Sequence, residues 1–349
     1  MLNAPMHEAR LYSPRTDGSL ECLVCERRCR LRTGVRGLCR NYMNIGGRLY
    51  SLGYGRLSAV ESRPIEVKPL YHYWPNSTAL TFSTFGCNFY CPWCQNHFLS
   101  FRDPGSDVPL MDPAHLVKLA RISGDKGLSA SFNEPTVNYE YLIDVADIAR
   151  SEELYLSIVT NGYQTPEALD ELVEVGFDGW SVDIKGCPGM RRALPGIDHS
   201  KVFRNARRVL DLGGHVEMVY LVVTRTNDYD ECSEWIIDNH LSKLGPEVPL
   251  HINRYYPAHK WREEATQLRK LLDIYARARK GGIEYVYVGN VGIPELETTK
   301  CPKCGKILVE RYNYSVTGFS LVREGGTYRC PRCGYKIPLR GMYSNSNSR

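Results

Sequence analysis

The chain has 349 residues, of which 43% are hydrophobic and 24% charged, a balance that excludes a disordered chain and a small disulfide-stapled fold. The length predicts two or three structural units. No apolar run is long enough to cross a bilayer, and the first residues lack a basic segment followed by an apolar one. We therefore expect a cytoplasmic protein that makes no use of a membrane.

The formal net charge of +5 is concentrated at the two ends. Residues 1–50 contain nine Lys and Arg against four Asp and Glu, and residues 301–349 contain nine against two. Such basic ends suit an RNA backbone, an acidic protein face or simply a solvated surface. The 13 cysteines are many for the cytoplasm, where disulfides are disfavoured, so we interpret their groups as metal sites.

Four cysteines lie in the first basic stretch, at Cys22, Cys25, Cys29 and Cys39. Four thiolates can close a zinc site or hold a second iron–sulfur cluster, and of the two we expect zinc. Counts of iron and zinc in anaerobically purified protein would decide between them. We assign residues 1–75 to this cysteine-rich basic module and its lead-in.

Short apolar runs then alternate with amphipathic segments from residue 76 to 292, which predicts repeated strand–helix units. The expected strands are 79–85, 127–132, 154–160, 179–185, 215–223, 249–256 and 284–288. The expected helices are 112–124, 138–152, 165–176, 200–214, 229–244 and 266–280. Because parallel neighbours require a crossover connection, about six such units predict an α/β fold with helices outside a parallel sheet.

Three cysteines follow the first of these strands, with the spacing C-x3-C-x2-C, at Cys87, Cys91 and Cys94. Three thiolates without a fourth suit a [4Fe-4S] cluster whose last iron stays open. A structural zinc site normally takes four protein ligands, and nothing nearby in the sequence completes this set. Zinc, or thiols without a metal, remain the alternatives.

Polar residues follow the later strands, at the strand ends where barrels of this class gather their chemistry. They are Asn133, Glu134, Asn161, Asp183, Lys185 and His251. The structural alternatives are that Glu134 merely ends a strand and that His251 is a satisfied core histidine. Cys187 at a strand end and Cys232 on a helix are expected to be buried, inert thiols.

Two C-x2-C pairs, each followed by glycine, mark the C-terminal segment that we assign to residues 293–349. The four thiols belong to Cys301, Cys304, Cys330 and Cys333. This pattern predicts a zinc ribbon with short strands between its pairs, and a rubredoxin-like iron site is the alternative. A closed tetrahedral site has no open position, so we expect a structural or docking module.

The central triplet, with Trp93 before its last cysteine, resembles the cluster loop of radical S-adenosylmethionine (SAM) enzymes. The branch related to pyruvate formate-lyase activating enzymes is similar at five further segments, namely 62–72, 94–96, 132–136, 159–163 and 182–186. Nearly the whole chain resembles the radical SAM member of the AmmeMemoRadiSam system.

This resemblance implies a partial (β/α)6 TIM-like barrel over residues 76–292. It implies a [4Fe-4S] cluster on Cys87, Cys91 and Cys94, with SAM chelated on the open iron. Reductive cleavage of SAM would give methionine and a 5′-deoxyadenosyl radical that abstracts hydrogen. Aromatic residues of the loop are expected to shield the cluster, and these are Phe85, Phe89, Tyr90 and Trp93.

The resemblance also implies the contacts to SAM. Glu134 would accept the methionine ammonium, in a segment where relatives have two glycines in place of Phe132 and Asn133. Around the SAM carboxylate and ribose the matching residues are Asn161, Asp183 and Lys185, and near the adenosyl group the match is His251. The stretch 223–228 departs from the family pattern, since it lacks the usual proline and glycine beside the adenine.

Our main hypothesis is therefore a radical SAM oxidoreductase that resembles the activases of glycyl radical enzymes. Its partners would be an electron donor protein and a protein substrate, or other proteins of the AmmeMemoRadiSam system. Modification of RNA is an alternative motivated by the basic ends. A non-catalytic metal-binding scaffold is a third, and it predicts no SAM cleavage with any reductant.

Overall fold

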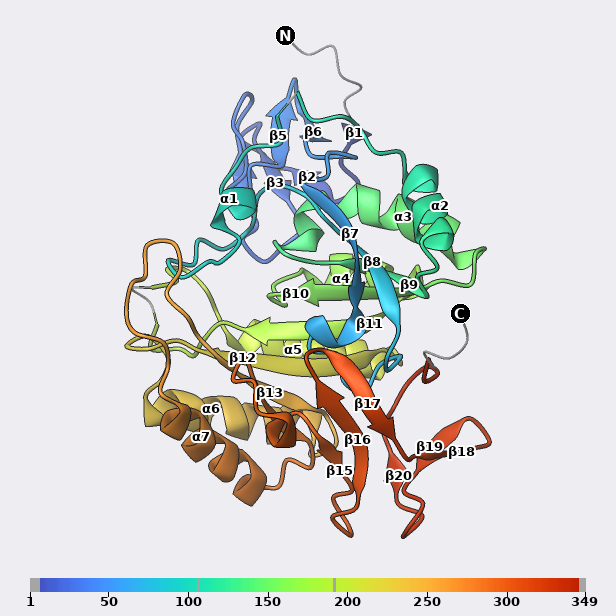
Figure 1. Cartoon of the computed structure of the whole chain (residues 1–349). Helices are drawn as coiled ribbons and strands as arrows, with labels where there is room; N and C mark the ends of the chain where they lie inside the picture. Colours follow the sequence, from blue (N-terminus) through green and yellow to red (C-terminus); the bar gives the residue numbers. More distant parts are fainter. Residues whose placement is uncertain (1–6, 106, 191–192, 345–349) are drawn as a thin grey trace. The chain divides into compact units, whose positions relative to one another are not determined.

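The computed structural model describes residues 7–105, 107–190 and 193–344 (Figure 1). The chain forms two compact units. The first unit comprises Met1–Arg63, Thr78–Trp180 and Asp211–Gly214. The second comprises Pro64–Ser77, Ser181–Leu210 and His215–Arg349.

The first unit begins with two small antiparallel sheets that form the cysteine-rich module. One sheet contains β1 (His7–Glu8), β6 (Arg48–Ser51) and β5 (Tyr42–Ile45). The other contains β2 (Tyr12–Pro14), β3 (Leu20–Cys22) and β4 (Arg30–Leu31). Leu20 and Leu31 are paired across the second sheet and both are buried, so this short module has an apolar core of its own.

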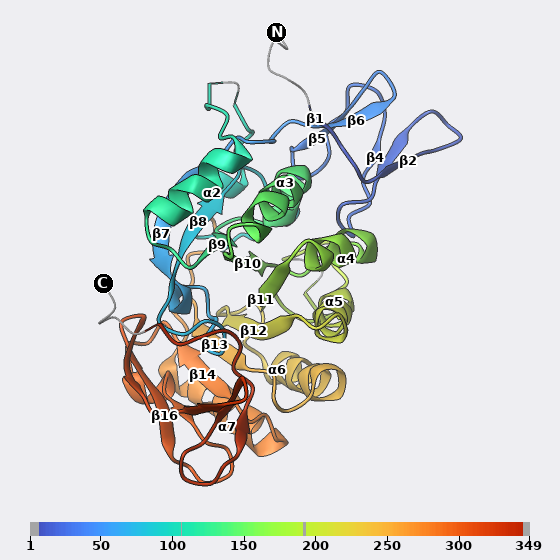
Figure 2. The ribbon, with the colours of Figure 1, turned by 90° about the vertical axis from the view of Figure 1, so that its right-hand side faces the viewer.

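The rest of the first unit is α/β. Its strands are β7 (Ala59–Pro64), β8 (Thr78–Ser83), β9 (Gly127–Ala130), β10 (Tyr155–Thr160) and the start of β11 (Phe177–Ile184). Its helices are α1 (His97–Ser100), α2 (Pro113–Ile122), η2 (Pro135–Asn138), α3 (Tyr139–Arg150) and α4 (Pro166–Glu174). Strands β8, β9 and β10 pair in parallel and are buried along most of their length, as crossover connections require. Helices α2 and α3 lie side by side (Figure 2).

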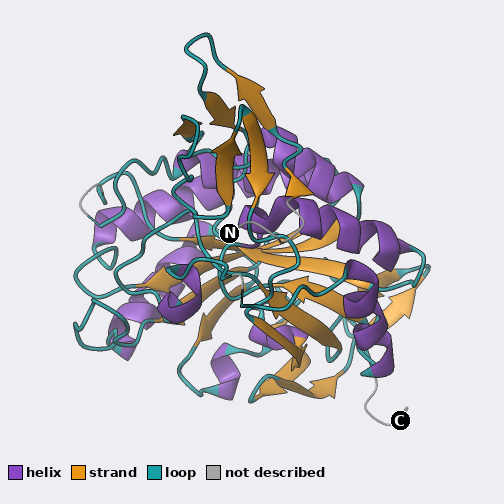
Figure 3. Ribbon diagram, turned by 90° about the horizontal axis from the view of Figure 1, so that it is seen from above, coloured by secondary structure: helices purple, strands orange, loops and turns teal. Residues whose placement is uncertain are grey.

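The second unit repeats this alternation. Its strands are the end of β11, β12 (His215–Val222), β13 (Leu250–Arg254) and β14 (Val286–Gly289). Its helical segments are η1 (Ile65–Val67), α5 (Ser200–Asp211), α6 (Asp230–Asn239), the π-helical turn η3 (His240–Leu244) and α7 (Leu268–Gly281). Strands β12, β13 and β14 are parallel neighbours, and helices lie beside the strands rather than among them (Figure 3).

The C-terminal part of the second unit follows the short helix η4 (Pro294–Leu296) and consists of two three-stranded antiparallel sheets. One contains β15 (Thr299–Lys300), β16 (Ile307–Tyr312) and β17 (Ser315–Phe319). The other contains β18 (Val322–Glu324), β19 (Thr327–Arg329) and β20 (Lys336–Ile337). Buried Leu308 and Tyr328 share one apolar cluster with Tyr285 and Tyr287, so this module packs on the β14 region.

The eight larger strands are hydrogen-bonded in the order β14-β13-β12-β11-β10-β9-β8-β7, which is the order of the chain. This mostly parallel sheet confirms the predicted α/β class, and each expected strand and helix has a counterpart. Asp112 and Thr165 cap α2 and α4 through their side chains, and Gly282 ends α7 in the left-handed conformation. Across the described ranges, no helix combines the length and apolarity needed to span a membrane.

Candidate metal and cofactor site

The central cysteine triplet lies on the loop between β8 and α1. The Cys94 amide donates to the Cys91 carbonyl at 3.1 Å, which closes a tight turn, and the Phe89 amide donates to Cys87 Sγ at 3.4 Å. The turn brings the three thiols close enough to interact electrostatically, and burial raises the pKa of Cys87 well above its usual value. A buried thiolate here needs a positive partner, which a metal centre provides.

The aromatic cover expected for this loop is present in three of its four residues. Phe85, Phe89 and Trp93 are each at most 4% exposed. Tyr90 is 37% exposed, and its hydroxyl donates to the Leu38 carbonyl at 2.7 Å. The hydroxyl of Tyr90 thus ties the cysteine loop to the N-terminal module, and its part in covering the loop stays a prediction.

The loop after β9 is tied to the cysteine loop by two side-chain amides. Asn133 Nδ2 donates to the Gly86 carbonyl and Asn96 Nδ2 to the Phe132 carbonyl, both at 2.6 Å. Phe132 has a φ of 71°, a left-handed conformation that is costly for a bulky side chain. This explains physically why glycine suits the position, and it places backbone strain next to the cysteine triplet.

Glu134 is buried, and its carboxylate accepts hydrogen bonds from several protein groups. Thr136 and Thr160 donate through their hydroxyls at 2.6 and 2.9 Å, and the Asn161 amide donates at 2.8 Å. Burial raises the pKa of Glu134, and the bonds from Thr136, Asn161 and Thr160 oppose this shift. The carboxylate thus fixes the turn after β10 to the loop after β9, and a ligand ammonium would have to replace one of these donors.

One buried side-chain acceptor near the triplet, Asn133 Oδ1, has no hydrogen-bond partner within the described residues. Buried amide atoms are normally paired, so this oxygen is available to a donor on a ligand. An acceptor suits an ammonium. The first unit therefore offers three thiols and, beside them, an acceptor of the kind that an ammonium requires.

In the second unit, Asp183 and Lys185 form an ion pair at the end of β11, with both side chains about one-fifth exposed. Residues two apart on a strand share a face, which explains why the two meet. One carboxylate oxygen, Asp183 Oδ1, is buried without a partner in the described structure.

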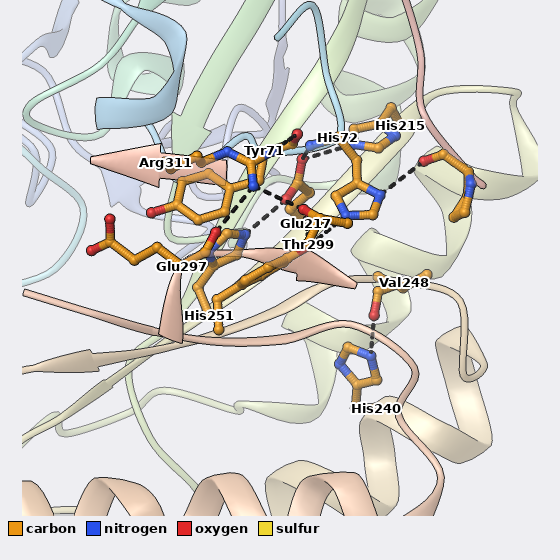
Figure 4. A network of polar contacts seen from close by, with 12 residues as sticks. Tyr71, His72, His215, Glu217, His240, Val248, His251, Glu297, Thr299 and Arg311 are labelled. Carbon is orange, nitrogen blue, oxygen red and sulfur yellow. Dashed lines mark hydrogen bonds and ion pairs between the residues drawn. The ribbon is translucent and has the colours of Figure 1, made fainter. Parts of the chain in front are cut away.

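His251 lies on β13 and belongs to a buried polar network (Figure 4). Its Nε2 lies 2.7 Å from Glu217 Oε2, and the other Glu217 oxygen is 3.0 Å from His215 Nε2 and 2.7 Å from the His72 amide. Burial of Glu217 favours its neutral form, but the bonds and charges of His215 and His251 lower its pKa well below the usual range. His251 is therefore positioned by a buried carboxylate.

Sequence reasoning missed Glu217 because it stands within an apolar strand, between Val216 and Met218. A charged residue inside a run of buried positions was the available signal, since such a residue must be paired. Sequence reasoning also missed Arg311, a charged residue that is only 1% exposed. Its guanidinium stacks over the Tyr71 ring at 4.3 Å and donates to the Tyr71 carbonyl (Figure 4).

Cys187 and Cys232 form a disulfide, so the expectation that both are free thiols was wrong. The start of the segment after β11 and helix α6 bring their Cα atoms within 5.5 Å, which is inside the range that a disulfide bridges. The two residues are 45 positions apart, and only the fold shows that they meet.

The four C-terminal cysteines form a group that can hold a metal ion. The Sγ atoms of Cys301 and Cys333 are 3.5 Å apart, those of Cys304 and Cys330 are 3.6 Å apart, and all four lie within 4.8 Å of one another. Thiolates at 2.3 Å around one tetrahedral zinc ion are separated by about 3.8 Å. The spacing therefore fits a single ion.

The four N-terminal cysteines meet around one cavity with about 320 Å³ of empty space, part of which opens to solvent. Cys22 donates its amide to the Cys29 carbonyl at 3.0 Å, and Cys22, Cys25 and Cys39 are buried. Burial raises the pKa of Cys25 to about 12, with the Asn88 side chain opposing the shift. The predicted grouping of these four thiols is thus present in the structure.

Residues 81–236 match the Radical SAM superfamily. The uncharacterized protein MJ0808 of Methanocaldococcus jannaschii is 35% identical over 313 residues, which cover 89% of this chain and 93% of that protein. A domain of pyruvate-formate lyase-activating enzyme from Bacteroides vulgatus is 15% identical, with a TM-score of 0.40, over 47% of this chain and 99% of that domain. A radical SAM methyltransferase from Sphaerobacter thermophilus is 14% identical, with a TM-score of 0.45, over 87% of this chain and 81% of that chain.

Proposed function

The chain belongs to the radical SAM superfamily, in one family with MJ0808, and from this premise we propose that it is an enzyme that removes hydrogen from its substrate. The observation that carries the proposal is the loop after β8, which presents Cys87, Cys91 and Cys94 beside the unpaired buried acceptor Asn133 Oδ1. When bound there, a [4Fe-4S] cluster and SAM supply an electron and a 5′-deoxyadenosyl radical for the abstraction.

The loop itself prepares the thiols for this role. Phe89 and Trp93 bury the surroundings of the triplet and exclude water. The Phe89 amide donates to Cys87 Sγ, and hydrogen bonds to cluster sulfurs are one of the means by which a protein sets the reduction potential. The strained Phe132 backbone and the two amide bonds from Asn96 and Asn133 hold the neighbouring loop in place.

Asn133 and Glu134 divide the binding of the SAM ammonium between them. Asn133 Oδ1 is the unpaired acceptor, and we assign it the direct contact. Glu134 is a positioning residue, since its hydrogen bonds to Thr160 and Asn161 fix the loop on which Asn133 stands. The carboxylate also gives this buried corner a negative charge that favours an ammonium.

The remaining contacts follow the family resemblance. Asn161, whose side chain donates to Asn88 Oδ1 at 2.7 Å, faces the same cysteine loop, and we assign it to the SAM carboxylate. Asp183 and Lys185 are assigned to the ribose and carboxylate, where the unpaired Asp183 oxygen can accept a hydroxyl. His251 is assigned to the adenosyl group, with Glu217 orienting its ring.

We further propose that the substrate is a partner protein, as for the activases that place a radical on glycine, and that a low-potential electron donor protein reduces the enzyme. The C-terminal cysteine group, with its single-ion spacing, would hold zinc and stabilise a docking module rather than take part in chemistry. This division of roles is consistent with the number of thiols, since the C-terminal group has four and the loop after β8 has three.

The test is the release of 5′-deoxyadenosine from SAM by reconstituted, dithionite-reduced protein under anaerobic conditions. We expect the wild type to release it and Cys91→Ala to release none, because a triplet without one thiol cannot hold the cluster. Cys232→Ala, which changes a cysteine of the disulfide, is the matched control and should remain active. A wild type that never cleaves SAM, with any reductant, would leave a metal-binding scaffold as the better description.

A further inference from the structure

We propose that the N-terminal module holds a second [4Fe-4S] cluster, bound by Cys22, Cys25, Cys29 and Cys39, and that this cluster passes electrons to the site at Cys87. The existence of the cluster does not depend on the proposed function. Only its role as a relay rests on that function.

The spacing of the sulfurs separates a cluster from a zinc ion. A cubane places four irons between its thiolates instead of one ion, so its cysteine sulfurs must stand further apart than those of a zinc site. The C-terminal group shows the tight arrangement, with all four sulfurs within 4.8 Å. Among the described residues, no three of the N-terminal sulfurs meet that limit, and neither do those of the central triplet.

The chain therefore contains its own two references. The four C-terminal sulfurs represent the single-ion case, and the triplet that the radical SAM motif assigns to a cubane represents the wide case. Like the triplet, the N-terminal four do not meet the 4.8 Å limit, although they match the C-terminal group in number. A wide set of four thiols is the ligand set of a fully coordinated [4Fe-4S] cluster.

The cavity between the N-terminal cysteines is kept open by a glycine. A Cβ at Gly37 would be in ordinary contact, at 3.9 Å, with both Cys29 Sγ and Cys39 Sγ, so a side chain longer than that of alanine would compete with the sulfurs for space. Because both sulfurs lie 3.9 Å from this one Cβ position, they cannot be further apart than twice that distance. One cluster can therefore reach both. The φ of Gly37 is not positive, so the glycine serves space rather than backbone conformation.

The module is fastened directly to the radical loop. Asn88 lines the N-terminal cavity, and its Oδ1 lies 3.9 Å from Cys87 Sγ, so a single side chain separates the two sets of cysteines. Arg27, which also lines the cavity, donates through Nε to the Asn88 carbonyl at 2.9 Å. A Cβ at Gly86 would stand 2.1 Å from the Cys39 carbonyl, so the two loops pack too closely for any other residue there.

These contacts define the role of the second cluster. With a cysteine on each iron, it has no open position for SAM or substrate, and electron transfer is the chemistry left to it. It would accept one electron from a low-potential one-electron donor, such as a reduced iron–sulfur protein or dithionite. It would then pass that electron to the cluster at Cys87, with no bond made or broken in the module.

The decisive protein is the full-length triple variant Cys87→Ala, Cys91→Ala and Cys94→Ala, purified and reconstituted without oxygen. We expect about eight iron atoms per wild-type chain and about four in the variant, with a reduced-state electron paramagnetic resonance (EPR) signal that SAM does not change. Zinc in the module would instead give about four iron atoms in the wild type and none in the variant, and would overturn the inference.

The same counts separate this inference from the proposed function. If the module binds a cluster but the triplet does not, wild type and triple variant will both contain about four iron atoms. The complementary variant Gly37→Leu keeps every cysteine and fills the cavity, and we expect it to lose the iron of the module while the SAM-sensitive EPR signal remains. A Gly37→Leu protein with the full iron content would contradict the site. Val35→Ala, at an exposed residue of the same module outside the cavity lining, is its control.

Discussion

Asn161 donates through Nδ2 to Asn88 Oδ1 at 2.7 Å, and this one bond joins the turn after β10 to the cysteine loop after β8. Both residues are buried, so the bond is made out of reach of water. Asn88 also lines the N-terminal cavity. The pair is therefore the point at which the turn after β10, the cysteine loop after β8 and the N-terminal module meet.

Replacing Asn161 with alanine should weaken SAM binding more than it weakens the fold. The substitution leaves Asn88 Oδ1 without its donor, at a cost of about 1–3 kcal/mol, and removes the side chain assigned to the SAM carboxylate. We expect at least a tenfold loss in SAM affinity, measured by the SAM-induced change of the EPR signal, with iron content retained. Asn239→Ala, outside the site on α6, should bind SAM normally. Unchanged affinity in Asn161→Ala would remove Asn161 from the site.

Backbone strain at Phe132 can be measured by comparing two small residues. Glycine adopts a φ of 71° without penalty, whereas alanine pays about 1–2 kcal/mol. We therefore expect Phe132→Gly to unfold in urea at a higher concentration than Phe132→Ala, although glycine is usually the less stable choice. Comparing the two variants with each other cancels the loss of the phenyl ring. An alanine variant as stable as the glycine variant would show that the position is not strained.

The C-terminal group should lose its metal when one cysteine is changed. Cys304→Ser is expected to reduce zinc from about one atom per chain to none, because three thiols and a hydroxyl bind zinc far less tightly. Its melting temperature should fall, and the iron content should stay at the wild-type value. Zinc retained in full, or iron lost in parallel, would contradict the assignment of separate centres.

Glu66 should make the stability of the protein depend on pH. Burial raises the pKa of this carboxyl to about 7, with Arg311 opposing the shift, and Glu66 Oε2 has no partner among the described residues. Because the folded pKa lies above the unfolded value of 4.5, the native state holds the proton more tightly. The contribution of Glu66 to stability is therefore fully present below pH 4.5 and is lost as the pH rises through 7. The free energy of unfolding falls by about 3 kcal/mol over this range.

Glu66→Gln cannot ionise and should remove this part of the pH dependence. Urea unfolding at pH 5 and pH 8 should show a smaller difference for the variant than for the wild type. Glu61→Gln, which changes a carboxyl on β7 whose side chain is 37% exposed, is the matched control and should behave as the wild type does. Equal pH dependence in Glu66→Gln and the wild type would show that the buried carboxyl does not titrate in this range.

Much of the fold could be predicted from the sequence because its signals are local. Alternating apolar runs gave the strands of the sheet, and Asp112 and Thr165 marked helix starts through their own side chains. The cysteine groups were also visible, because Cys87, Cys91 and Cys94 lie within one loop and their spacing is set by a few bonds.

The rest depended on contacts between distant segments. The Cys187–Cys232 disulfide joins residues 45 positions apart, and reasoning from the cellular compartment pointed away from it. Glu217 on β12 orients His251 on the neighbouring strand β13, and the two meet because of the register in which these strands pair. The sulfur spacing of the N-terminal module is a property of three dimensions, so the sequence could group those cysteines but not choose their metal.

The measurement that tests the central claim most directly is EPR spectroscopy of reduced, anaerobic wild-type protein before and after addition of SAM. We predict a [4Fe-4S] signal that changes with SAM, together with release of 5′-deoxyadenosine, and the loss of both in Cys91→Ala. A reduced protein whose iron signal ignores SAM, or whose central triplet holds zinc, would contradict the account.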